Sequence, residues 1–186
     1  MLIDKLLSLV FGILFLVALS CDGPGSRTGE RGDVAARTLS DDPAFWDYAF
    51  SSNLLQTEIG QLVNEKEVSM EVKALASEAA SYHGKALREL KPLAKRYTSA
   101  PLSDSLSRAD RDLVNEFKQL DGEELESRYR AFIRSTHQNQ LTRYQEALQR
   151  AEDQRIRKFL NGMLEHLRQE LTALAKLDSL QGEPVD

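Results

Sequence analysis

The sequence predicts an all-α domain. From about residue 41 to residue 180, apolar residues recur at spacings of three and four, and no segment alternates as a strand would. Serine or aspartate stands before several of these periodic segments, as is typical of helix caps. A span of about 140 residues is the size of one ordinary domain and is long enough to bury a sizeable core.

The first predicted helix runs from Pro43 to about Lys66. Asp41 and Asp42 supply its cap, and proline suits the first turn because its missing N–H would have no partner there. Its apolar stripe contains Phe45, Tyr48, Ala49, Leu55, Ile59, Leu62 and Val63.

The second predicted helix begins after the cap residue Ser69. The connection to the first helix is very short, so the two should be antiparallel neighbours. Pro92 should either kink this helix or end it before Tyr97. Its stripe contains Val72, Leu75, Ala76, Ala79, Ala86, Leu87 and Leu90.

A loop over residues 98–106 leads to a shorter third helix. Ser107 with Asp110 resembles a capping box, and Asp121-Gly122 is expected to end the helix. Its apolar residues are Leu113, Val114, Phe117 and Leu120.

Two further long helices are predicted, from about Glu123 to Ala151 and after the cap residue Asp153. The fourth should face inward through Leu125, Tyr129, Phe132, Ile133, Tyr144, Ala147 and Leu148. On the same helix, Arg128, Arg130, Arg134 and Arg143 should form a solvated face. The fifth helix presents Ile156, Leu160, Met163, Leu164, Leu167, Leu171 and Leu174.

Two helical hairpins joined by a long crossover predict a ferritin-like antiparallel four-helix bundle with a short extra helix in the crossover. The predicted bundle covers residues 41–180, and residues 181–186 are expected to be a disordered tail.

Upstream, an apolar stretch from Leu6 to Leu19 leads to Cys21, the one cysteine of the chain. About 14 residues make about 21 Å of helix, short of a hydrocarbon core of about 30 Å. Residues 1–20 are therefore predicted to be a signal peptide. A cysteine just beyond the cut is typical of a bacterial lipobox and predicts lipidation of Cys21. A plain signal peptide or an uncleaved anchor is the alternative.

Residues 21–40 are predicted to be the lipidated cysteine and a flexible tether, because they are rich in small and polar residues without apolar periodicity. The predicted location is the periplasmic side of a bacterial membrane, where Asp22 favours the inner membrane. The membrane is then a partner through the lipid, and an envelope protein could be another. The net charge of −5 argues against nucleic acid and against electrostatic docking on anionic lipid.

The three histidines of the chain, His83, His137 and His166, each fall near the middle of a predicted long helix. All three lie within or beside an apolar stripe, and His137 and His166 should be level across their hairpin. With an acid such as Glu58 or Glu170, they could bind a transition metal. They could equally form a buried, hydrogen-bonded polar cluster without a cofactor.

A di-iron site is not expected. Ferritin-like di-iron proteins use Glu-x-x-His on two helices, and here Ala80, Arg134 and Met163 stand three residues before the histidines. The sequence also contains no Gly-rich phosphate loop, no nucleophile elbow and no legible catalytic triad, so no enzymatic activity is predicted.

Several short segments together resemble a bacterial family of exported, ferritin-like helical domains, the domain of unknown function 4142. They are Leu55-Gln56-Thr57-Glu58-Ile59-Gly60-Gln61-Leu62, Val72-Lys73 with Ala76, Tyr82-His83 with Glu89-Leu90, Tyr129 with His137, and Leu164 with His166-Leu167. The resemblance covers about Asp41 to Leu177 and implies the fold and export, but no reaction. This chain departs from the family at Tyr82, where aspartate is usual before the histidine.

The sequence thus favours a lipid-anchored periplasmic helical-bundle protein that acts as a binding or envelope-associated module. The alternative is a metal-binding or redox-protective bundle that uses the inward histidines. No cofactor is required by the first function, whereas the second needs a transition metal ion.

Overall fold

The computed structural model describes the chain except for residues 1–37, 40–41, 98–101, 103–104 and 182–186. The predicted signal peptide, most of the tether and the tail lie outside the described residues. The described part is all-α, as predicted, and has no strand. Its helices are α1 (Pro43–Glu65), α2 (Met70–Tyr97), α3 (Arg108–Gln119), α4 (Gly122–Arg150) and α5 (Gln154–Gln181).

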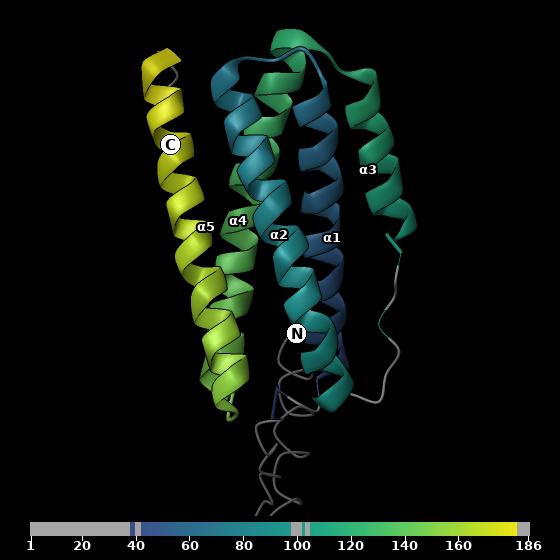
Figure 1. The fold of residues 1–186 in the computed structure, drawn as a ribbon, viewed down its shortest axis with the longest axis vertical. Helices are drawn as coiled ribbons and strands as arrows, with labels where there is room; N and C mark the ends of the chain where they lie inside the picture. The colour runs from purple at the N-terminus through teal and green to yellow at the C-terminus, as the bar shows by residue number, and fades with distance from the viewer. Residues whose placement is uncertain (1–37, 40–41, 98–101, 103–104, 182–186) are drawn as a thin grey trace, which may run out of the picture. The chain divides into compact units, whose positions relative to one another are not determined.

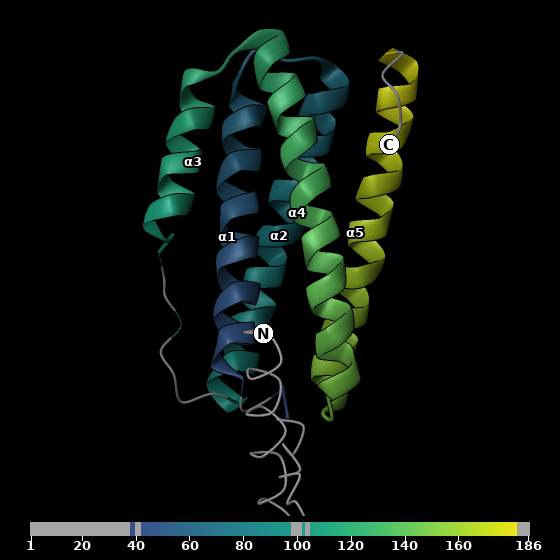
Figure 2. The same ribbon diagram turned by 180° about the vertical axis from the view of Figure 1, so that it is seen from behind.

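The four long helices lie side by side with α3 on the outside (Figures 1 and 2). Helices α1 and α2 form one antiparallel hairpin, and α4 and α5 form the other. Helix α2 also packs on α5, α1 packs on α4, and α3 packs on α1. Within the described residues, none of these helices is long and apolar enough to cross a membrane.

The predicted helix starts are confirmed by their caps. Asp42 accepts a hydrogen bond from the Phe45 N–H at 3.1 Å, and Ser107 accepts one from the Asp110 N–H at 3.1 Å. Asp153 likewise accepts a hydrogen bond from the Arg155 N–H at 2.7 Å. These side chains satisfy N–H groups that have no partner within their helix.

The structure decides one predicted helix end and corrects another. Helix α2 continues through Pro92 to Tyr97, which rules out the predicted alternative that the proline stops the helix. Helix α3 ends at Gln119, before the predicted Asp121-Gly122 stop, and Gly122 is the first residue of α4 with φ of +56°. The Lys66 ammonium donates to the carbonyl oxygens of Lys118 and Leu120, which lie at the C-terminal end of α3. A cation at this position stabilises the helix, because it interacts favourably with the negative end of the helix dipole.

The predicted solvated arginine face of α4 is wrong at Arg130. Its side chain is 8% exposed and lies 3.5 Å from the carboxylate of Asp178 on α5. Arg134 pairs with the same carboxylate. The spacing along α4 alone does not reveal this pair, because the partner carboxylate lies 48 residues further along the chain at Asp178.

The core consists of two apolar clusters. The first, called here the lower cluster, surrounds Trp46 and includes Leu90, Tyr144 and Leu160. The second, the upper cluster, surrounds Phe117. On each long helix, buried polar residues lie at or next to the junction between the two clusters. They are Asn53 and Gln56 on α1, His83 on α2, His137 and Gln140 on α4, and His166 and Glu170 on α5. We call these seven residues the polar layer.

Candidate metal centre

The polar layer brings all three predicted histidines together around one carboxylate. His83, His137 and Glu170 are at most 2% exposed, and His166 is 5% exposed. Glu170 follows His166 by four residues, so both side chains lie on the same face of α5. The other two rings come from α2 and α4, so three helices position the cluster.

A single oxygen of Glu170, Oε2, faces the Nε2 atoms of all three rings. The distances are 2.5 Å to His137, 3.0 Å to His166 and 3.7 Å to His83. The His83 ring centroid lies 5.8 Å from that of His137 and 5.7 Å from that of His166. The Nε2 atoms of His83 and His166 and the second oxygen of Glu170 make no hydrogen bond to any described residue.

These distances distinguish residues spaced as ligands of one metal ion from a residue that makes a hydrogen bond. Ligand atoms bonded at about 2.0–2.2 Å to a tetrahedral ion lie about 3.4 Å from one another. The 3.0 Å and 3.7 Å separations of His166 and His83 from Glu170 bracket that value. Together these three residues offer ligand atoms that all lie within 4.8 Å of one another. At 2.5 Å, His137 is too close to Glu170 to share a tetrahedral ion, but it is suitably placed for a hydrogen bond.

The hydrogen bond with Asn53 determines which nitrogen of His83 carries the proton and which keeps its lone pair. The Asn53 amide N–H₂ donates to the carbonyl oxygen of Ala49 at 2.6 Å, so its oxygen must face His83. That oxygen lies 2.8 Å from Nδ1 of His83, and Nδ1 must therefore carry the proton. In the neutral ring, Nε2 then keeps its lone pair and points toward Glu170. Second-shell hydrogen bonds orient metal-binding histidines in this way.

Burial and the neighbouring groups also shift the acid–base properties of the cluster. Burial lowers the pKa of His83 to about 4, against the opposing effect of the Glu170 carboxylate, so the ring is neutral near pH 7. Burial acts to raise the pKa of Glu170, but the hydrogen bond with His137 and the close approach of the His166 and His83 imidazoles outweigh it and hold the pKa far below its usual range. A buried carboxylate in its ionised form requires a neighbouring positive charge. A protonated imidazole or a metal cation could supply it.

The structure thus unites four of the five predicted site residues. Glu58 is only partly buried, and it makes no hydrogen bond or ion pair with the histidines within the described part of the chain. Cys21 lies outside the described residues.

Sequence reasoning missed two residues of the site. One is Asn53, whose signal is an amide that lies within the apolar stripe of α1. The other is Tyr82, whose ring stacks on His166 with centroids 3.3 Å apart. The Tyr82 hydroxyl donates to the carbonyl oxygen of Gly162 at 2.9 Å and so joins α2 to α5.

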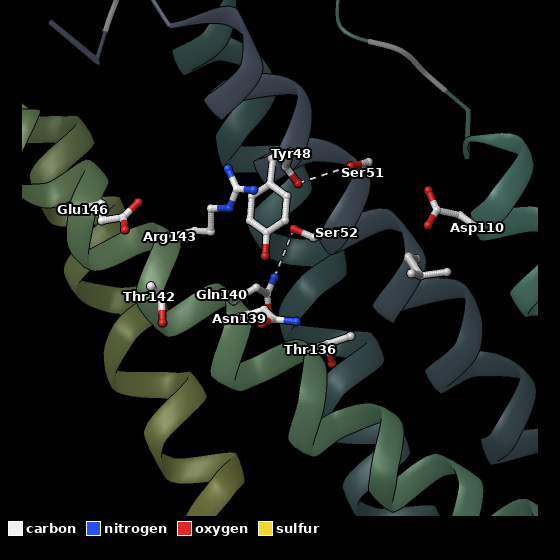
Figure 3. A pocket seen from close by; sticks show the side chains of 11 residues that line it. Tyr48, Ser51, Ser52, Asp110, Thr136, Asn139, Gln140, Thr142, Arg143 and Glu146 are labelled. Atoms are coloured by element: carbon white, nitrogen blue, oxygen red, sulfur yellow. Dashed lines mark hydrogen bonds between the residues drawn. The ribbon is translucent and has the colours of Figure 1, made fainter. Parts of the chain in front are cut away.

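A polar groove of about 660 Å³ lies beside the layer, between α1 and α4 (Figure 3). Gln140 lines this groove and is buried in the layer, where its amide N–H₂ donates to the Ser52 hydroxyl at 3.1 Å. Its carbonyl oxygen accepts a hydrogen bond from Gln56 at 2.7 Å. Asp110 of α3 lies across the groove.

The fold and the site together define an all-helical domain with a buried histidine–carboxylate cluster. The model of one family, described as a domain of unknown function (DUF4142), matches residues 29–177. The chain belongs to this family, as the sequence resemblance predicts. No curated protein and no solved structure matches the chain significantly.

Proposed function

We propose that this protein is an envelope-associated, ferritin-like four-helix bundle that binds one divalent transition-metal ion at its centre. His83, His166 and Glu170 are the ligands, and His137 holds the carboxylate by a hydrogen bond. The observation that carries the proposal is the pair of separations, 3.7 Å and 3.0 Å, from the two imidazole nitrogens to one carboxylate oxygen. Both match two ligands of one tetrahedral ion.

The ligand chemistry narrows the choice of ion. Two imidazoles and one carboxylate suit zinc or ferrous iron, whereas calcium and magnesium prefer oxygen ligands. The chain has no second cysteine for a thiolate site. The four residues of the cluster are at most 5% exposed, so a substrate could not reach the ion without a movement of the helices. We therefore propose that the site binds or stores the ion and does not catalyse a reaction.

The proposed location rests on the sequence of the predicted signal peptide, residues 1–20, and of Cys21. Lipidation of Cys21 would hold the bundle on the periplasmic side of a bacterial membrane, and a tether of about 20 residues would let it move about 25 Å from the anchor. Mass spectrometry of the mature N-terminus tests this part separately. An unmodified Cys21, or a chain that retains residues 1–20, would contradict it.

The metal site is tested by stripping the purified full chain with a chelator and titrating it with zinc. We expect one ion per chain with a dissociation constant below micromolar. Glu170→Gln and His83→Gln should each weaken binding by 100-fold or more, because each removes one of three ligands. The matched control is Glu58→Gln, which removes the other predicted acid and should leave the affinity unchanged.

Substitution of His137 separates a ligand from a positioning residue. His137→Gln keeps a hydrogen-bond donor beside Glu170 and should lose only about 10-fold to 100-fold in zinc affinity. Cobalt, whose visible absorption reports its coordination, should give the same spectrum in this variant as in the original chain. A stoichiometry of zero, or equal losses for Glu58→Gln and Glu170→Gln, would refute the site.

A further inference from the structure

A second groove, of about 610 Å³, lies between α2 and α5 and differs from the polar groove in its chemistry. Its floor is apolar and contains Ala86, Leu93, Phe159 and Met163. Tyr82 and Gly162 also line it, and the Tyr82 ring stacks on His166 of the polar layer. We call it the α2–α5 groove.

Basic side chains surround the apolar floor. Lys85, Arg155 and Lys158 line the groove, against one acid, Glu89. The Lys85 ammonium is 3.9 Å from the Glu89 carboxylate, and both side chains are more than half exposed. An exposed pair at this distance is weak and is readily exchanged for another anion. Lys158 makes no ion pair with any residue that the structure describes.

The basic residues continue beyond the groove along both helices. The segments 84–97 of α2 and 154–163 of α5 contain eight lysines and arginines and one glutamate. At the same end of the domain, Asp42 pairs with Arg150 and Asp153 pairs with Arg155, and the two segments remain basic when Arg155 is set aside. The net charge of −5 therefore hides a local excess of positive charge, which the overall composition cannot reveal.

This end of the domain is also where the chain enters it. Trp46, near the start of α1, stacks on Tyr97 at the end of α2 with ring centroids 6.2 Å apart. The Tyr97 hydroxyl in turn hydrogen-bonds Asp153, just before α5. Figure 1 shows the start of α1, the end of α2 and the start of α5 at one end of the domain. The predicted anchor precedes α1 in the chain.

We propose that the α2–α5 groove binds an acidic phospholipid of the membrane that holds the anchor. The phosphate would lie among Lys85, Arg155 and Lys158, and apolar parts of the lipid would contact the floor at Phe159 and Met163. A basic rim around an apolar floor is complementary to an anionic amphiphile, whereas a cation would be repelled. This inference goes beyond the metal site and does not depend on it.

The test uses the full chain with Cys21→Ser, which prevents acylation, in flotation with vesicles. Vesicles of phosphatidylglycerol and phosphatidylcholine in equal parts are compared with vesicles of phosphatidylcholine alone. The apolar residues 1–20 are present in both experiments, so the difference in binding between the two kinds of vesicle reports recognition of the acidic lipid. We expect stronger binding to the acidic vesicles, weakening with salt.

Two variants locate the binding. Lys85→Gln, Arg155→Gln and Lys158→Gln together should reduce binding to the acidic vesicles roughly 100-fold, at about fivefold per charge. The control variant carries Arg108→Gln, Arg168→Gln and Lys176→Gln. It also loses three positive charges, but outside the groove, and should keep the preference for acidic vesicles.

Gly162→Leu separates binding in the groove from general attraction to the surface. A Cβ at Gly162 meets only the Tyr82 hydroxyl, at the ordinary contact distance of 3.7 Å, and Gly162 lines the groove, so a leucine there should occupy part of the groove without changing the charge. We expect it to abolish most of the preference for acidic vesicles. Unchanged binding of Gly162→Leu, equal binding to both vesicle types, or equal losses in the two triple variants would overturn the proposal. Zinc titration of the same samples reports the metal site independently.

Discussion

The lower cluster and the polar layer lie on the same four helices but depend on different forces. The lower cluster is stabilised by burial of apolar surface, which has no direction and tolerates side chains of similar volume. The polar layer depends on aligned hydrogen bonds and charges, and removing one partner leaves the other buried and unpaired. The stability of the fold is therefore distributed over many residues, whereas a few individual residues determine the site.

The largest effect on stability is expected in the lower cluster. Leu160 is fully buried there, and Leu160→Ala should lower the free energy of unfolding by about 2–5 kcal/mol through the lost apolar contact and the cavity left behind. Urea denaturation of the metal-free protein measures this change. Zinc affinity should be unchanged in the folded variant, and a parallel loss of zinc affinity would show that the cluster and the layer are not separable.

The second prediction concerns the pH dependence of the metal-free protein. Burial lowers the pKa of His83 from 6.5 to about 4, so between these values the unfolded chain binds more protons than the folded chain. Stability should therefore fall as the pH decreases from 6.5 toward 4, by about 3 kcal/mol from this residue. Glu170 acts in the same direction at lower pH, because its pKa is held below the unfolded value.

Denaturation curves at a series of pH values measure this slope. His83→Asn removes the titrating ring and should flatten the curve between pH 6.5 and 4, whereas Leu160→Ala should shift the whole curve without changing its slope. If the slope persists in His83→Asn, the polar layer is not the source of the acid sensitivity.

The same difference explains what the sequence could predict. Apolar periodicity and cap residues located every helix of the described region, because each helix repeats its signal over many residues. They also placed the three histidines in the interior. Periodicity could not show that Arg130 is buried, because its partner Asp178 lies on another helix at a position fixed by tertiary packing.

The detail of the site depends on tertiary packing. Glu170 and Glu58 were equal candidates in the sequence, and only the packing of α5 against α2 and α4 selects Glu170. The role of Asn53 depends on a contact across 30 residues, from its side-chain oxygen to His83. No local pattern encodes such a contact.

A pair of glycines tests how closely α1 and α2 pack in the upper cluster and beside the polar layer. Gly60 lies on α1 where a Cβ would be 2.8 Å from the carbonyl oxygen of Ala76 in the upper cluster. Gly60→Ala should therefore cost about 1–3 kcal/mol of stability, because the backbones of α1 and α2 must separate.

Gly84, next to His83 in the sequence, is the matched control. A Cβ there would be 3.6 Å from the Thr57 methyl group, an ordinary contact. Gly84→Ala should stabilise the protein by about 0.5–1 kcal/mol, because alanine is the better helix former. Thermal denaturation measures both, and the same sign for both variants would contradict the close approach at Gly60.

The smallest effect is expected at Tyr82, where the polar layer meets the α2–α5 groove. Tyr82→Phe removes the hydrogen bond to the Gly162 carbonyl oxygen but keeps the ring that stacks on His166. Because Tyr82 is partly exposed, water can replace the lost donor, and the cost should be about 1 kcal/mol or less. Zinc affinity should be unchanged, since the ring still holds His166 in place. Tyr82→Ala should instead weaken zinc binding and speed its release to a chelator. Equal release rates for the two variants would show that the ring does not separate the groove from the metal site.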